Sequence, residues 1–211
     1  MKMSESEFLQ LFAGVFTPFF QTCGFAWSGN LLFTRNRECI EQRVVFAVSA
    51  ASSGVLRLTC GVGIRIPVIE KIIRPEREGA NLPTVGMPLH LLKPDNDYRP
   101  WVFSHKDEFL ALETKIRADV TTYIVPFFER YSSVAAVYTA LESEVPRDWF
   151  MSTSDHRDSL LVAKAMLDQG KTAALALGDR LLSAYAGKLP KYSMTLRDLL
   201  CRIRNEQPEP S

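Results

Sequence analysis

Apolar and polar residues alternate with a period of two over residues 40–66. In the second half of this stretch, the even positions are mostly apolar, namely Leu56, Leu58, Cys60, Val62, Ile64 and Ile66. The odd positions carry Arg57, Thr59, Gly61, Gly63 and Arg65. Residues 40–50 show the same alternation, and the Ala-Ser-Ser-Gly sequence at 51–54 is typical of a turn. The pattern predicts a long antiparallel β-hairpin with one face on a core and the other toward solvent or a partner.

A three- and four-residue period precedes the hairpin. Ser4 and Glu7 have the spacing of a capping box, and behind them the apolar stripe is Phe8, Leu11, Phe12, Val15, Phe16, Phe19 and Phe20. Pro18 should kink this helix or end its regular hydrogen bonding, and Gly24 suits a C-terminal stop. We expect the aromatic stripe to pack on the even-numbered face of the hairpin.

The remaining elements follow from shorter patterns. Strands are predicted at 25–27, 31–36 and 101–103, and helices at 104–131 and 132–141. Residues 68–73 fit a short helix or a strand equally well. Residues 75–100 hold five of the 12 prolines, and only 85–92 resembles a strand. Helical segments are predicted at 156–169, 171–187 and 194–205.

These elements predict an α+β fold. An antiparallel sheet built on the long hairpin is packed by the N-terminal and central helices and followed by a C-terminal helical bundle. We expect an α+β domain over residues 1–146, a C-terminal helical segment over 147–205 packed on it, and a flexible tail over 206–211.

Composition excludes few classes of protein. The chain has 46% hydrophobic and 23% charged residues with a formal net charge of +1, which is ordinary for a soluble globular protein. The apolar run near the N-terminus is interrupted by Gln10, Thr17 and Pro18, so it makes a poor signal peptide. Cys23, Cys39, Cys60 and Cys201 lack metal-ligand spacing, which indicates reduced thiols. We therefore expect a cytoplasmic protein with no metal and no cofactor.

Candidate catalytic groups are sparse. Gly170-Lys171-Thr172 lacks the first glycine and the preceding strand of a phosphate-binding loop. The acidic and histidine clusters at 105–108 and 155–158 begin predicted helices, where capping explains them better than acid–base catalysis. A non-catalytic protein is therefore favoured. An enzyme whose pocket lies under the Pro75–Pro100 segment, with His90, His105 and nearby acids converging, stays open as an alternative.

Charge is unevenly distributed along the chain. Residues 31–77 contain eight basic and four acidic residues, whereas the rest contains 17 basic and 20 acidic ones. Arg43, Arg57 and Arg65 occupy odd positions of the hairpin, so the face opposite the apolar one should carry guanidinium groups. Such a face is either merely solvated or recognises an acidic protein surface or phosphates. The candidate partner-binding residues are these three together with Arg35 and Trp101.

The order of short motifs resembles a known family. The motifs are Gly24-Phe25, Phe33-Thr34-Arg35, the hairpin, Trp101, and the run Pro126-Phe127-Phe128-Glu129-Arg130-Tyr131-Ser132-Ser133. In this order, over roughly residues 8–142, the chain is similar to the bacterial domain-of-unknown-function family DUF4304. Val48-Ser49 stands where that family tends to carry a glutamine, and Thr59 where it tends to carry an asparagine. The resemblance implies an α+β fold and a bacterial origin, with no established reaction.

We expect a cytoplasmic protein-binding module. By association, its partner could be a toxin or effector with an acidic surface, which would make the chain an immunity protein. The other hypotheses are the enzyme described above and a nucleic-acid-associated regulator. Nucleic acid is disfavoured because the arginine-bearing face lacks interleaved aromatic residues on which bases stack.

Overall fold

The computed structural model describes residues 5–52, 54–77, 83–96, 98–143, 150 and 152–205. Its contacts divide the chain into two compact units. Unit 1 comprises Met1–Arg65 and Gly86–Ala136, and unit 2 comprises Ile66–Val85 and Val137–Ser211. The predicted boundary at residue 146 falls outside the described ranges and stays a prediction.

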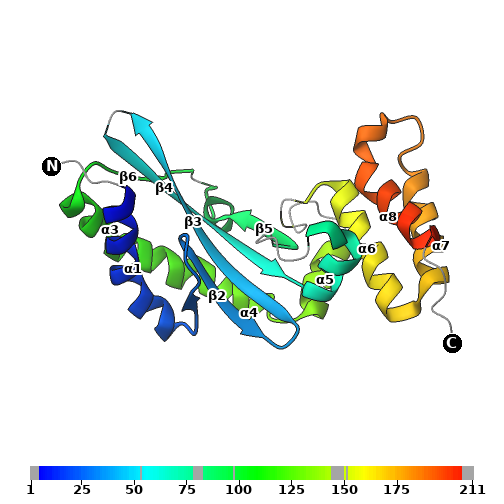
Figure 1. Ribbon diagram of the computed structural model, residues 1–211, viewed down its shortest axis with the longest axis horizontal. Coiled ribbons are helices and arrows are strands. Elements are labelled where there is room, and N and C mark those ends of the chain that lie inside the picture. Colours follow the sequence, from blue (N-terminus) through cyan, green and yellow to red (C-terminus); the bar gives the residue numbers. More distant parts are fainter. Residues whose placement is uncertain are drawn as a thin grey trace. The chain divides into compact units, whose positions relative to one another are not determined.

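The sheet is antiparallel, as the alternation predicted, and the α+β class is confirmed. Its strands are β1 (Ala26–Trp27), β2 (Leu32–Arg37), β3 (Ile40–Ser52), β4 (Val55–Arg65), β5 (Val85–Pro88) and β6 (Trp101–Phe103). Their order is β1-β2-β3-β4-β5, and β6 also pairs with β4. The β3–β4 hairpin is the longest feature of the sheet and extends beyond β2 (Figure 1).

The hairpin register confirms the predicted alternation. Glu41 pairs with Arg65, Val48 with Leu58 and Ser49 with Arg57. Odd-numbered residues of both strands therefore lie on one face of the hairpin, and even-numbered residues lie on the other. The register shifts between Ala50 and Ser52, where β3 carries a bulge next to the turn. Val44, Leu58 and Ile64 are completely buried, which assigns the even-numbered face to the core.

Helices cover that even-numbered face within unit 1. They are α1 (Glu5–Thr22), α3 (Lys106–Asp119) and α4 (Val125–Arg130). The α1 stripe places a fully buried phenylalanine at every fourth position, namely Phe8, Phe12, Phe16 and Phe20. The Phe12 ring lies 4.9 Å from that of Phe46 on β3, and the Phe8 ring lies 5.3 Å from that of Phe109 on α3. The aromatic stripe is therefore core, as expected.

Pro18 does not end α1, which continues to Thr22. The stop comes at Gly24, where φ is +79°, and the Phe25 N–H bonds Phe20 C=O. This is the expected role for a glycine after a helix, since a left-handed residue turns the chain and satisfies the last carbonyls.

A second proline shapes the long central helix. α3 and α4 are joined by one π-helical segment, Val120–Ile124, in which Val125 N–H reaches back to Val120 C=O. Pro126 follows immediately, and its ring would clash with the carbonyl four residues earlier in a regular α-helix. The wider turn relieves that clash, so the helix changes geometry where the sequence predicted only disruption.

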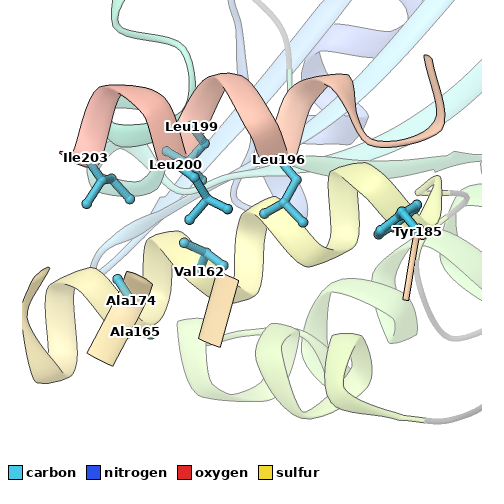
Figure 2. Packing of buried hydrophobic residues seen from close by; sticks show 8 residues of the cluster. All are labelled: Val162, Ala165, Ala174, Tyr185, Leu196, Leu199, Leu200 and Ile203. Atoms are coloured by element: carbon cyan, nitrogen blue, oxygen red, sulfur yellow. The ribbon is translucent and has the colours of Figure 1, made fainter. Parts of the chain in front are cut away.

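Unit 2 is mostly helical in the part that the structure describes, and it also includes Val85, the first residue of β5. Its elements are α2 (Pro67–Ile73), the C-terminal part of α5 (Val134–Glu142), α6 (Ser154–Gln169), α7 (Lys171–Ser183) and α8 (Met194–Asn205). Residues 68–73 are thus helix, not strand. Apolar side chains of α6, α7 and α8, with Tyr185 beyond the end of α7, form one buried cluster: Val162, Ala165, Ala174, Tyr185, Leu196, Leu199, Leu200 and Ile203 (Figure 2).

Asp155 holds the start of α8 against α6. Its two carboxylate oxygens accept hydrogen bonds from the backbone N–H groups of Thr195 and Leu196, both at 2.9 Å. The start of α6 itself is capped by Thr153, whose hydroxyl accepts from His156 N–H. The acidic cluster at 155–158 therefore does cap a helix, but Asp155 caps a different helix from the one it begins.

Candidate partner-binding face

One face of the sheet in unit 1 is left uncovered by α1, α3 and α4, and we call it the open face. Strand pairing assigns to it the following side chains or glycines: Ala26, Leu32, Thr34, Asn36, Glu41, Arg43, Val45, Ala47, Ser49, Arg57, Thr59, Gly61, Gly63, Arg65 and Val102. Most are small or β-branched, which suits a pleated sheet surface.

The exposed part of the open face is apolar and uncharged over most of its length. Val45 is 38% exposed and Val102 is 50% exposed, while Ala47 and Ser49 are also exposed. Val45 pairs with Gly61 and Val102 with Arg57, so the two valines are four residues apart along β4.

The arginines mark the two ends of this face instead of forming one patch. Arg57 is exposed near the hairpin turn, opposite Ser49, and Arg65 is half-buried at the other end of β4. Eight residues separate them, which corresponds to about 26 Å at about 3.3 Å per residue. A single acidic group therefore cannot contact both.

Arg43 shares the open face but is only 2% exposed. Its Nε forms an ion pair with Glu41, the residue that pairs with Arg65 across the hairpin. The Arg43 Nη1 and the Arg65 Nε are buried without a hydrogen-bond partner in the part of the chain that the structure describes. Both nitrogens are enclosed by neighbouring atoms, so neither of them faces solvent.

Arg35 lies on the other face of the sheet, within the helix-covered core. Its Nε donates to Gln42 Oε1 at 2.7 Å, and its Nη1 and Nη2 donate to Cys23 C=O and to Glu129 Oε1. Its guanidinium also stacks over the Phe25 ring at 4.6 Å. Arg35 therefore ties β2 to β3 and α4, and it is 8% exposed. We exclude it from the open face.

Trp101 is likewise a core residue. It pairs with Leu58, its ring lies 6.2 Å from that of Phe46, and it is 5% exposed. Of the five residues that the sequence suggested for partner binding, Arg43, Arg57 and Arg65 lie on the open face, and Arg57 is the most exposed. Arg35 and Trp101 belong to the opposite face, because their positions in β2 and β6 direct their side chains toward the core.

The groups named for an enzymatic alternative have separate partners. The His90 ring packs against Tyr98 at 4.9 Å, whereas His105 pairs with Glu108 at the start of α3. Burial raises the pKa of the Cys60 thiol, with the Asp119 charge adding to the shift, so this cysteine is protonated and a poor nucleophile at neutral pH.

A partly buried ion pair joins the proline-rich segment to α3. Lys93 Nζ contacts Asp119 Oδ2 at 2.9 Å and lies 5.7 Å from the centre of the Tyr123 ring. Both charges are therefore neutralised by partners within unit 1, which fits a structural role for the pair.

Uncharged residues of the open face were missed by the sequence-based interpretation. Val45, Ala47, Ser49 and Val102 carry no distinctive chemistry, so a search for catalytic or charged groups passes over them. One signal was present: residues 44–56 contain no charged side chain, although their odd positions face away from the core. A solvated outer strand normally carries charges.

The described residues define an α+β protein whose sheet has one face that α1, α3 and α4 do not cover. No family model, no curated protein and no solved structure matches this chain. The resemblance to the DUF4304 family stays a prediction. Within the described residues, no helix combines the length and the apolar character needed to cross a membrane.

Proposed function

We propose that this chain is a non-catalytic protein-binding module that contacts its partner through the open face. The observation that carries the proposal is the exposure of Val45 and Val102 on a face that carries no charge between its two ends. Burial of aliphatic and small side chains supplies the association energy, because removing apolar area from water is favourable.

The ends of the face determine which partner fits. Arg57, Arg65 and Arg43 contribute three positive charges and Glu41 one negative charge, so the face has a net charge of +2. Guanidinium groups pair well with carboxylates, and a partner with acidic side chains about 26 Å apart matches both ends. In keeping with the resemblance, the partner we propose is a bacterial toxin or effector of acidic surface, which this immunity-type protein would mask in the cytoplasm.

Nucleic acid is a poorer fit to this face. None of its residues on β1–β4 and β6 is aromatic, whereas Trp27, Phe33, Phe46 and Trp101 are on the core side. Proteins that bind single strands stack bases on exposed aromatic rings. The distribution of aromatic residues therefore favours a protein partner.

The test is a binding measurement with two purified proteins. The partner is recovered by co-purification, expressed separately, and titrated against the wild type, Arg57→Glu, Val45→Glu and the double variant. We expect the double variant to bind at least about tenfold more weakly, since it reverses one charge and places another on the apolar area.

Lys115→Glu is the matched control. Lys115 is exposed on α3, which covers the other side of the sheet, so its charge reversal should leave the affinity unchanged. If Lys115→Glu weakens binding and the Val45 and Arg57 variants do not, the open face is not the contact surface.

A further inference from the structure

Near the hairpin turn, the outer edge of β3 has no strand partner among the described residues. β2 pairs with β3 only from Ile40 to Val45, and the last contact beyond this is the Phe46 N–H bond to Leu31 C=O. No described strand pairs with residues 47–52 on that side, and we call this stretch the free edge. Its residues are exposed apart from the half-buried Val48.

The direction of the backbone groups follows from the observed hydrogen bonds. Phe46 N–H points toward β2, and backbone groups of successive residues in a strand point to opposite sides. Val48 and Ala50 therefore direct their N–H and C=O groups outward at the free edge. Ser49 directs its groups inward, to Arg57 on β4.

From residue 47 to residue 50, the free edge lacks the features that prevent strand addition. Natural edges are protected by lysine, proline, inward charges or bulges. Here residues 44–56 contain no charged residue and no proline, and the bulge begins only after Ala50. The edge is thus regular and neutral from Phe46 to Ala50.

We propose that two copies of this chain pair through the free edge of β3, antiparallel and about a two-fold axis at Ser49. In this arrangement Val48 of one copy pairs with Ala50 of the other, and each pair exchanges two backbone hydrogen bonds, about four in all. Ser49 lies opposite its own copy. The facing side chains of residues 48–50 are uncharged and no larger than valine.

Neutrality is what favours a second copy as the occupant. A two-fold axis places each residue near the axis opposite itself or a close neighbour, so any charge there would meet its like. A free edge built from alanine, valine and serine avoids that repulsion. The paired strands bury little area, so the dimer should be weak and visible only at high protein concentration.

Amide hydrogen exchange is the direct readout. In wild-type protein, the Val48 and Ala50 amides should exchange freely at low concentration and become protected as the concentration rises toward about 1 mM, in step with the dimer fraction from sedimentation equilibrium. The Ser49 amide already bonds to β4 and should stay protected throughout.

Charge variants test the position of the axis. Ser49→Lys or Ser49→Glu alone places like charges opposite each other and should weaken the dimer by about tenfold, whereas an equimolar mixture of the two should restore association. Val102→Lys adds the same charge on β6, which lies on the far side of β4 from the free edge, and serves as the control. Folding of each variant is checked by circular dichroism.

Three results would overturn the proposal. They are sedimentation as a monomer up to about 1 mM, association that Ser49→Lys leaves unchanged, and a dimer in which the Val48 and Ala50 amides still exchange freely. None of these measurements involves the partner of the open face, so this inference and the proposed function fail separately.

Discussion

Gly178 of α7 lies so close to Leu200 of α8 that a β-carbon on the glycine would come within 2.2 Å of Leu200 Cδ2. Leu200 is fully buried within the unit 2 cluster, so its side chain has little room to move. Gly178→Ala should therefore lower the free energy of unfolding by about 1–2 kcal/mol, the cost of overpacking less the helix propensity gained by alanine. Urea unfolding followed by circular dichroism measures it.

In the Leu200→Ala background, the effect of Gly178→Ala on stability should have the opposite sign. Once the leucine is truncated, Gly178→Ala fills space and should stabilise by about 1 kcal/mol. Gly14→Ala is a matched control in α1, where a β-carbon meets no atom within 4 Å, and it should also stabilise by about 1 kcal/mol. Loss of stability in Gly14→Ala, or the same sign in both backgrounds of Gly178→Ala, would show that α7–α8 packing is not the cause.

Removal of the Asp155 carboxylate should loosen α8. Asp155→Ala leaves the N–H groups of Thr195 and Leu196 without their acceptor, and we expect a loss of about 2 kcal/mol. Hydrogen exchange should show the first turn of α8 affected first. The control is Asp198→Ala on the exposed side of α8, which should change stability by less than about 0.5 kcal/mol.

His156 should make the stability of unit 2 depend on pH. Its Nε2 donates to Thr84 C=O at 2.9 Å, and burial lowers its pKa in the folded state. In the unfolded chain the histidine pKa is about 6.5, so the unfolded chain binds more protons than the folded one. The contribution of His156 to the free energy of unfolding is therefore fully present above about pH 7 and is lost as the pH falls through 6.

The difference between wild type and His156→Gln isolates this effect. Glutamine retains a donor for Thr84 C=O but does not titrate. The free energy of unfolding of the variant should therefore lack the decrease at low pH that the histidine causes. Burial raises the pKa of Asp158, which acts in the opposite direction and is present in both proteins. Identical pH profiles for the two proteins would contradict the assignment of a neutral, buried His156.

Arg35 and Arg57 should differ sharply when truncated. Arg35→Ala leaves Gln42, Cys23 C=O and Glu129 without their donor inside unit 1, and we expect a loss of about 2–3 kcal/mol. Arg57→Ala removes an exposed side chain and should change stability by less than about 0.5 kcal/mol. Tryptophan fluorescence, to which the core residue Trp101 of unit 1 contributes, reports the unfolding of both variants.

The local elements of this protein could be read from single residues and short periods. Phe8, Phe12, Phe16 and Phe20 at four-residue spacing predict a buried helix face, and the alternation in β4 predicts the hairpin and its core side. These predictions were confirmed because helix and strand geometry link residue spacing directly to direction. Gly24 was predicted as a helix stop for the same local reason, whereas the π-helical segment before Pro126 was not foreseen.

The candidate site was only partly predictable. Parity placed Arg43, Arg57 and Arg65 on one face, but it cannot say that Arg43 is buried beside Glu41 or that β2 ends level with Val45. Arg35 was misplaced on the partner-binding surface. The face on which it lies depends on its pairing with Gln42 in the neighbouring strand, and local sequence does not show that pairing.

By itself, the sequence determined the α+β class, the hairpin and the side of β4 that meets the core, because these depend on backbone periods and on the exclusion of apolar groups from water. Only the tertiary structure decided which arginines are exposed, that Asp155 caps α8, and that β3 has a free edge. Those properties depend on contacts between residues far apart in the chain, where strand register and helix packing bring groups together that no local pattern connects.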